Sequence, residues 1–249
     1  MTRRLSARPV LLVLSAIGFL ASVGPVAAQD VAPDKPTKIT ADAAYISTNG
    51  NSEVTTVSGG DKLEHKHANW IFTQEARAVW GNVDGVETTA KYGASLRGDY
   101  LISSRLSSYL LGAWRREPFA GISRQFDEGV GLSWHAVVSK PHEVDLEGGA
   151  GLLQRKDTLG DEADFGTART GARYKYSFTE KAYLEAKGAY LFNLKEARDS
   201  QGDGSVALVA PITGGFSMKF GYDVFYRNKP LPGLKTTDSS FSAGIQFSN

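Results

Sequence analysis

The sequence of 249 residues contains no cysteine, so an exported fold has to be stable without disulfide bonds. It also lacks an excess of charge of either sign, with 28 Lys and Arg against 27 Asp and Glu. This balance argues against a nucleic-acid-binding surface, which is strongly basic. After residue 28 no apolar run reaches the roughly 20 residues that a membrane-spanning helix needs. The absences exclude disulfide scaffolds, nucleic-acid-binding proteins and helical membrane proteins.

The N-terminus has the three parts of a secretory signal peptide: a basic start, an apolar run over residues 10–23, and small residues before a cleavage site at Ala28. The run is too short for a spanning helix, which disfavours the alternative of an uncleaved anchor. We interpret residues 1–28 as a signal peptide, 29–37 as a short N-terminal segment and 38–249 as one outer-membrane β-barrel domain.

Apolar and polar side chains alternate along the C-terminal segment. One parity carries Met218, Phe220, Tyr222, Val224 and Tyr226, and the other carries Lys219, Gly221, Asp223 and Arg227, with Phe225 as the exception. Successive side chains of a strand point to opposite faces, so the segment has one apolar and one charged wall. A transmembrane barrel places the apolar wall against lipid and the polar wall inside. The same pattern recurs along most of the chain.

The alternation and the turn residues divide the chain into about twelve strands. Their expected ranges are 38–48, 52–65, 69–81, 86–101, 106–116, 122–138, 142–155, 165–178, 181–195, 204–211, 215–228 and 236–247. Residues 181–195 are rich in helix formers, but their strict alternation favours a strand. We predict an all-β fold, a transmembrane antiparallel up-and-down β-barrel, with 10 or 14 strands as alternative counts. An even number places both termini on the periplasmic side, with six short loops outside.

Aromatic residues gather near the expected strand ends, as in the interfacial girdles of membrane barrels. The candidates are Trp70, Phe72, Trp80, Tyr100, Tyr109, Trp114, Trp134, Phe178 and Tyr226. Phe247 would be the terminal aromatic of the last strand. In a secreted soluble β-sandwich or lipocalin-like binder the same residues would form an ordinary core, and this alternative stays open at the level of sequence.

Three short motifs resemble one protein family. Residues 45–53 (YISTNGNSE) are similar to a "G-N-(T/S)-(D/E)" opening, and the Thr-rich residues 54–59 follow it. Residues 115–122 (RREPFAGI) resemble a "D-x-F-x-G-(I/L)" loop, and residues 129–132 (GVGL) resemble the glycine-alternating strand after it. Together they resemble the domain of unknown function 481 (DUF481) family, the YdiY-like, salt-induced outer-membrane proteins of Gram-negative bacteria. The resemblance covers nearly all of the chain after residue 28, and Glu117-Pro118 departs from its pattern. It implies a fold and a location, and no reaction, ligand or catalytic residue.

Charged residues of both signs are expected on the interior parity of the strands. They are Glu75, Arg77, Lys91, Arg97, Asp99, Asp127, Asp145, Glu147, Arg169, Arg173, Lys175, Glu185, Lys187, Lys219, Asp223 and Arg227. One interpretation is a narrow, porin-like pore whose Arg and Lys side chains favour anions. The other is a salt-bridge network that fills the barrel of a structural envelope protein, since small barrels are readily filled by side chains.

Catalytic and metal chemistry has little support in the sequence. His65 and His67 would share one strand face, but no third ligand stands at a suitable spacing, so we expect no metal site. Ser133 and His135 share the parity of Asp127, which leaves a Ser-His-acid lipid hydrolase as an alternative function. We expect no catalytic residue and no cofactor.

The sequence therefore predicts a non-enzymatic protein of the outer membrane of a Gram-negative bacterium, porin-like or structural. Its expected partners are outer-membrane lipid and, during insertion, the barrel assembly machinery, with no nucleic acid. The solute and the oligomeric state do not follow from these residues.

Overall fold

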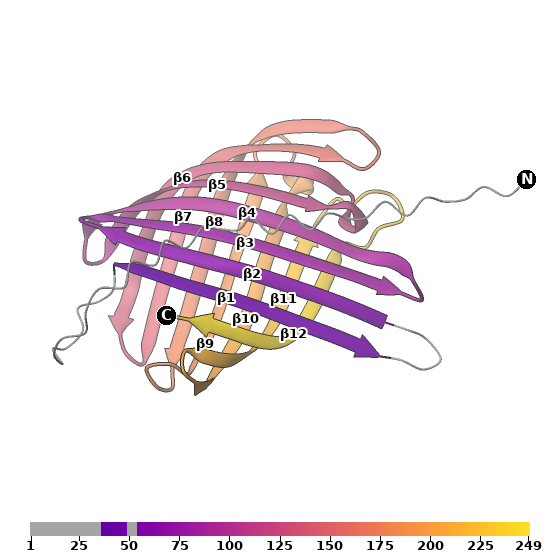
Figure 1. The fold of residues 1–249 in the computed structure, drawn as a ribbon. Coiled ribbons are helices and arrows are strands. Elements are labelled where there is room, and N and C mark those ends of the chain that lie inside the picture. The colour runs from indigo at the N-terminus through magenta and orange to yellow at the C-terminus, as the bar shows by residue number, and fades with distance from the viewer. Residues whose placement is uncertain (1–35, 49–53) are drawn as a thin grey trace, which may run out of the picture. The chain divides into compact units, whose positions relative to one another are not determined.

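A computed structural model describes residues 36–48 and 54–249 (Figure 1). The predicted signal peptide lies outside these residues. Among them no helix is long and apolar enough to cross a membrane. The strands are β1 (Thr37–Thr48), β2 (Val54–His67), β3 (Trp70–Val83), β4 (Val86–Ser103), β5 (Leu106–Glu117), β6 (Ile122–Ser139), β7 (His142–Asp157), β8 (Glu162–Ser177), β9 (Tyr183–Asn193), β10 (Gln201–Thr213), β11 (Phe216–Arg227) and β12 (Thr237–Ser248). Two short 3-10 helices, η1 (Pro118–Ala120) and η2 (Ala197–Asp199), lie in connections.

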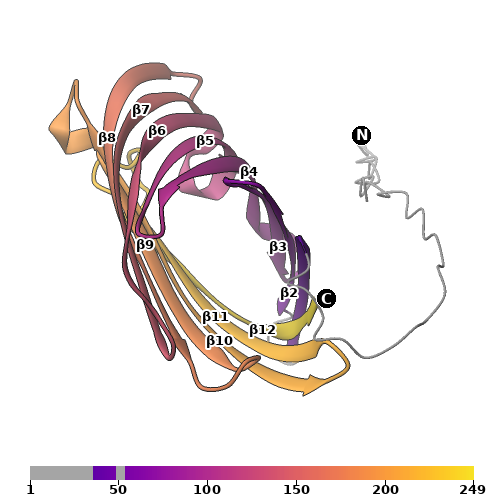
Figure 2. The same ribbon diagram turned by 90° about the vertical axis from the view of Figure 1, so that its left-hand side faces the viewer.

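The strands form a closed barrel in which each strand pairs antiparallel with its neighbours in sequence, and β1 pairs with β12 (Figure 2). The closing register sets Ala43 opposite Ile245. Closure removes the free strand edges that an open sheet would expose. The predicted up-and-down barrel and its twelve strands are confirmed, including the helix-prone β9.

The two ends of the barrel differ in their connections. We call one the turn end, because short turns such as residues 68–69, 104–105 and 214–215 join its strands and β12 ends there. The other is the loop end, where η1, η2 and residues 228–236 lie. Longer loops at one end and short turns at the other are typical of outer-membrane barrels.

Side-chain burial is inverted relative to a soluble protein. Val130, Leu132 and Trp134 on β6 are exposed on the outer wall, whereas Gln125 and Ser133 on the opposite parity are buried inside. Soluble proteins bury their apolar side chains and expose their polar ones. An outer wall of large apolar residues around a polar interior is the pattern of a barrel that lipid surrounds. Within residues 36–48 and 54–249, no apolar core of the kind expected for a soluble sandwich is present.

Aromatic rings form clusters on the outer wall at the turn end. Trp70 stacks on Phe72 with ring centroids 5.6 Å apart and meets Tyr100 at 5.2 Å. Phe247, near the end of β12, packs against Phe216 of β11 at 5.1 Å. Aromatic rings in such belts sit at the interface between lipid and water.

Tyr109 is a correction to the predicted girdle, because its side chain points inward and is buried. Its ring lies beneath the Arg97 guanidinium, 4.2 Å from the ring centroid. A Cβ atom at Gly131 or at Gly149 would lie 2.6 Å from the Tyr109 hydroxyl oxygen. Glycine at both positions leaves the space that the ring fills, so this part of the interior is packed by an aromatic residue.

β10 begins at Gln201 instead of the expected residue 204. Gln201 pairs with Leu191 on one side and Arg227 on the other, so the ladder extends through the glycines that predicted a loop. The Tyr190 ring covers Gly202, since a Cβ atom there would lie 2.9 Å from Tyr190 Cδ2. Glycine here serves close packing within the strand.

Candidate functional site: the charged interior

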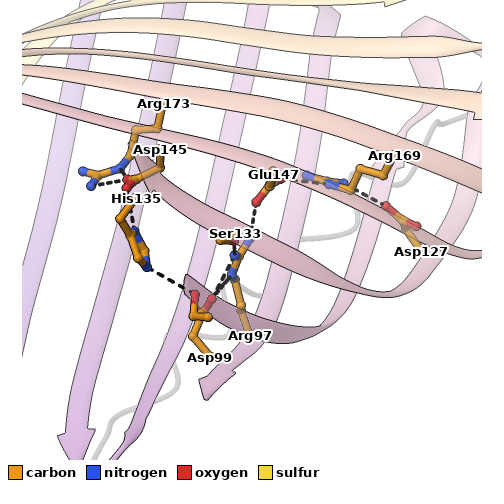
Figure 3. A network of polar contacts seen from close by, with 10 residues as sticks. Arg97, Asp99, Asp127, Ser133, His135, Asp145, Glu147, Arg169 and Arg173 are labelled. Carbon is orange, nitrogen blue, oxygen red and sulfur yellow. Dashed lines mark hydrogen bonds and ion pairs between the residues drawn. The ribbon is translucent and has the colours of Figure 1, made fainter. Parts of the chain in front are cut away.

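Arg97 of β4 is the centre of a polar network inside the barrel (Figure 3). Its guanidinium donates to Asp99 at 2.9 Å, to Glu147 of β7 at 2.7 Å and to the hydroxyl of Ser133 on β6 at 2.9 Å. Because β4 and β7 are separated by two strands, the side chains meet inside the barrel. Charge-assisted bonds of this kind are the strongest side-chain hydrogen bonds.

Two arginines of β8 continue the network along the same wall (Figure 3). Arg169 lies 3.2 Å from Glu147 and 3.4 Å from Asp127 of β6. Arg173 donates from Nε to Asp145 at 2.7 Å, and its Nη1 lies 3.3 Å from Glu185 of β9. The wall from β4 to β9 thus carries alternating charges in contact, as expected for opposed cross-strand pairs.

Further ion pairs join strands that are not neighbours. Arg77 of β3 lies 3.0 Å from Asp223 of β11, and Lys187 of β9 lies 4.0 Å from Glu75 of β3. Lys219 of β11 donates to Asp42 of β1 at 2.7 Å. These pairs bridge one strand (Lys219–Asp42), three strands (Arg77–Asp223) or five strands (Lys187–Glu75) of the wall through the interior.

Each of the sixteen residues expected on the interior parity takes part in an ion pair. The remaining three contacts are Lys91 with Glu117 at 3.9 Å, Lys175 with Glu143 at 4.0 Å, and Arg227 with Asp199 at 3.8 Å. The expected set of sixteen leaves out several partners, notably Asp42, Arg115, Glu117, Glu143, Arg155, Asp199 and Asp203. Parity on residues 142–155 already places Glu143 and Arg155 inward, whereas Asp199 and Asp203 lie in a stretch that the turn residues predict to be a loop.

Accessibility divides the interior into two sides. The side chains of Lys62, Glu75 and Lys187 on β2, β3 and β9 retain 46%, 41% and 50% exposure. Asp127 and Glu147 of the opposite wall retain 13% and 17%. Since all of them lie on interior parity, the first group borders solvent-accessible space inside the barrel. We call it the wet side, and the wall of β4 to β8 the packed side.

At the loop end, apolar side chains and loop contacts narrow the interior of the barrel. Ala120 of η1, Ile122 and Phe225 form a buried cluster, so Phe225, the exception to the alternation, belongs to the interior. A Cβ atom at Gly121, whose φ is +77°, would lie within 3 Å of methyl groups of Leu231 and Leu234. The loop 228–236 therefore closes directly over η1.

A second loop contact at this end joins Lys229 to Glu196 at 2.8 Å. The hydrogen bond and the positive charge of Lys229 lower the pKa of Glu196 below its usual range.

His135 has partners that differ from those of the hydrolase alternative. Its Nε2 lies 3.3 Å from Ser107 Oγ of β5, and its Nδ1 lies 2.7 Å from Asp145 Oδ1. Ser133 instead accepts from Arg97, and Asp127 pairs with Arg169. Ser107, His135 and Asp145 thus contact one another in the order serine, histidine, aspartate that a catalytic triad has. Ser107 has no exposed surface, so an acyl group could reach it only after rearrangement.

Of the two histidines considered for a metal site, His65 has another contact. His65 Nδ1 lies 2.8 Å from the Thr37 hydroxyl, a contact between β2 and β1. Across residues 36–48 and 54–249, no group of three or more His, Asp or Glu side chains is arranged to hold a metal ion.

The closed barrel, its apolar outer wall and its charged interior define a porin-like β-barrel. The family described as "Protein of unknown function, DUF481" matches residues 41–248. The chain belongs to this family, as its motifs predicted. No curated protein matches the sequence.

The solved structures to which the chain is similar include two porins and the translocator domain of an autotransporter. A structure of the NanC porin has a TM-score of 0.51 at 12% identity, over 84% of this chain and 98% of that chain. The translocator domain of the autotransporter NalP from Neisseria meningitidis has 0.44 at 12% identity, over 85% and 87%. The KdgM porin has 0.42 at 11% identity, over 85% and 98%. At 12% identity, the likeness to the NanC porin structure shows a shared fold alone.

Proposed function

We propose that the protein is a narrow, water-filled channel for small hydrophilic solutes in the outer membrane of a Gram-negative bacterium. The observation that carries this proposal is the wet side of the interior, where Lys62, Glu75 and Lys187 keep 41–50% of their side-chain surface exposed. A lumen filled only by salt bridges would leave such side chains buried. The loop end would face outward and both chain termini the periplasm, with outer-membrane lipid around the apolar wall.

The sixteen charged residues would act in two ways in this channel. On the packed side, contacts such as Arg97–Glu147 and Arg169–Asp127 fill space and brace the wall. On the wet side, charges of both signs line the passage, as in the pair of Arg77 and Asp223. Because the charges oppose one another across the lumen, we expect weak selectivity between cations and anions.

A structural envelope protein is the second candidate function. The packed side favours it, because Arg97, Glu147 and Asp127 are partly buried in a continuous network that needs no solute. The two functions differ in a measurable property, because a filled barrel conducts no ions while a channel with a wet side does.

Purified, folded protein in planar lipid bilayers is expected to give discrete current steps. Removing a cross-lumen pair with the Arg77→Ala/Asp223→Ala double variant should raise the conductance of each step, because two side chains leave the passage together and no charge is left unpaired. A matched control is Lys156→Ala/Glu162→Ala, which removes an exposed pair outside the lumen. A flat trace from inserted, folded wild-type protein would remove the channel proposal and leave the structural one.

A further inference from the structure

Three buried charged side chains meet at the loop end. Arg155 comes from β7, Arg227 ends β11, and Asp199 ends η2 between β9 and β10. Their relative exposures are 7%, 6% and 7%. β7 and β11 are not neighbours, so the two guanidinium groups come together inside the barrel with the Asp199 carboxylate between them.

The Asp199 carboxylate accepts a hydrogen bond from Arg155 but lies too far from Arg227 to accept one. Its Oδ2 lies 2.6 Å from Arg155 Nη2 and 3.4 Å from Asn193 Nδ2. Its Oδ1 lies 3.8 Å from Arg227 Nε, which is beyond hydrogen-bond distance. Within the described part of the chain, four buried atoms of the cluster have no hydrogen-bond partner: Arg155 Nη1, Arg227 Nε, Arg227 Nη1 and Asp199 Oδ1.

A fourth buried charge does not complete the cluster. The Oδ1 atom of Asp157 accepts the backbone N–H groups of Leu159 and Asp161, so it folds the loop after β7. Buried guanidinium donors without partners are costly, so each calls for an explanation, and a bound ion is one of the explanations that such groups have in native proteins.

A free oxyanion fits these donors better than one carboxylate of the chain does. A phosphate, sulfate or carboxylate group can accept paired hydrogen bonds from a guanidinium, and a tetrahedral anion has oxygens for two guanidinium groups at once. We propose that Arg155 and Arg227 form a binding site for a small oxyanion, which replaces Asp199 between them. This site goes beyond the channel function and does not depend on it.

The loop that carries Asp199 has other anchors, so Asp199 can leave without unfolding it. Asn193 Oδ1 accepts the N–H groups of Lys195 and Glu196, and Lys229 pairs with Glu196. Both arginines lie on the interior parity of their strands. The ligand is therefore a dissolved anion that reaches the arginines from the water at the loop end, and not a lipid headgroup at the outer wall.

The test is calorimetric titration of folded protein in an uncharged maltoside detergent with inorganic phosphate, against sodium chloride at matched ionic strength. The wild type should bind weakly, because the tethered Asp199 carboxylate competes at an effective concentration in the millimolar range or above. Asp199→Ala removes this competitor and should bind phosphate at least about tenfold more tightly. Asp199→Asn, expected to shift in the same direction, replaces it should the alanine variant not fold.

Two further substitutions in the Asp199→Ala background locate the site. Arg227→Gln should abolish the gain in affinity. Arg124→Gln, at an exposed arginine near the same end, should leave it unchanged. The proposal is overturned by an Asp199→Ala protein that binds no more tightly than the wild type, or by a gain that survives Arg227→Gln. Because no current is measured, these outcomes are independent of whether the barrel conducts.

Discussion

Arg97→Ala is expected to destabilise the barrel by about 3–5 kcal/mol, the range for breaking a buried ion pair by removing one partner. Arg97 holds Asp99 and Glu147 together, bonds Ser133 and covers the Tyr109 ring. Without Arg97, the carboxylates of Asp99 and Glu147 remain inside the packed side. Among the described residues, Asp99 has no ion-pair partner other than Arg97. Glu147 keeps Arg169 at 3.2 Å, which limits the loss.

The measurement is the free energy of unfolding in urea, with the protein folded reversibly into lipid vesicles. Arg124→Ala is the matched control, because Arg124 is an exposed arginine whose ion pair with Glu162 is long at 3.5 Å. Exposed pairs of this kind contribute roughly 0–1 kcal/mol. If Arg97→Ala lowers the free energy of unfolding as little as Arg124→Ala does, then water solvates the network and the side chains of this wall are not closely packed.

Val130→Arg is expected to cost about 2–4 kcal/mol in a bilayer, the range for a basic residue on the lipid face of a barrel near the midplane. Val130 lies midway along β6, and its side chain is exposed on the outer wall between Leu132 and Glu128. A guanidinium there has to be inserted among acyl chains.

Val57→Arg provides the depth control, because Val57 lies near the start of β2 at the loop end and is exposed on the outer wall opposite Trp80. Near the interface the same substitution should cost only about 0–1 kcal/mol. Both are measured by urea unfolding in the same vesicles. Equal costs at the two positions would contradict the assignment of the outer wall to lipid.

The fold could be predicted from sequence because a barrel wall repeats one local rule. Alternation along residues 122–138 and 142–155 is set by the geometry of an extended chain and is visible without any long-range information. The predicted girdle contains one error. Tyr109 faces inward, and only its contacts with Gly131 and Gly149 show why the interior takes its ring. Phe225 faces inward as its parity requires, and it packs against η1.

The ion pairs were less predictable than the strands. Pairs within one hairpin, such as Asp145 opposite Arg173, follow from register. Arg115 with Asp203 joins β5 to β10 at 2.5 Å, and this depends on how the whole sheet closes. The stagger between distant strands is set when the barrel closes, so it cannot be predicted from the spacing of residues within one strand. The contact of Ser107 with His135 is different, because it joins the neighbouring strands β5 and β6 and follows from their register.

The central claim is that the wet side is a water-filled passage, and the absence of cysteine allows a direct test of it. A single Lys187→Cys substitution places the only thiol on the half-exposed interior side chain of β9, and Val130→Cys places it on the outer wall as control. The measurement is the current through bilayers containing each variant, before and after a bulky, water-soluble thiol reagent. We expect the reagent to reduce the current through Lys187→Cys and to leave that through Val130→Cys unchanged. A Lys187→Cys protein that is folded and inserted but carries no current, or whose current is unaffected after complete modification, would contradict the account.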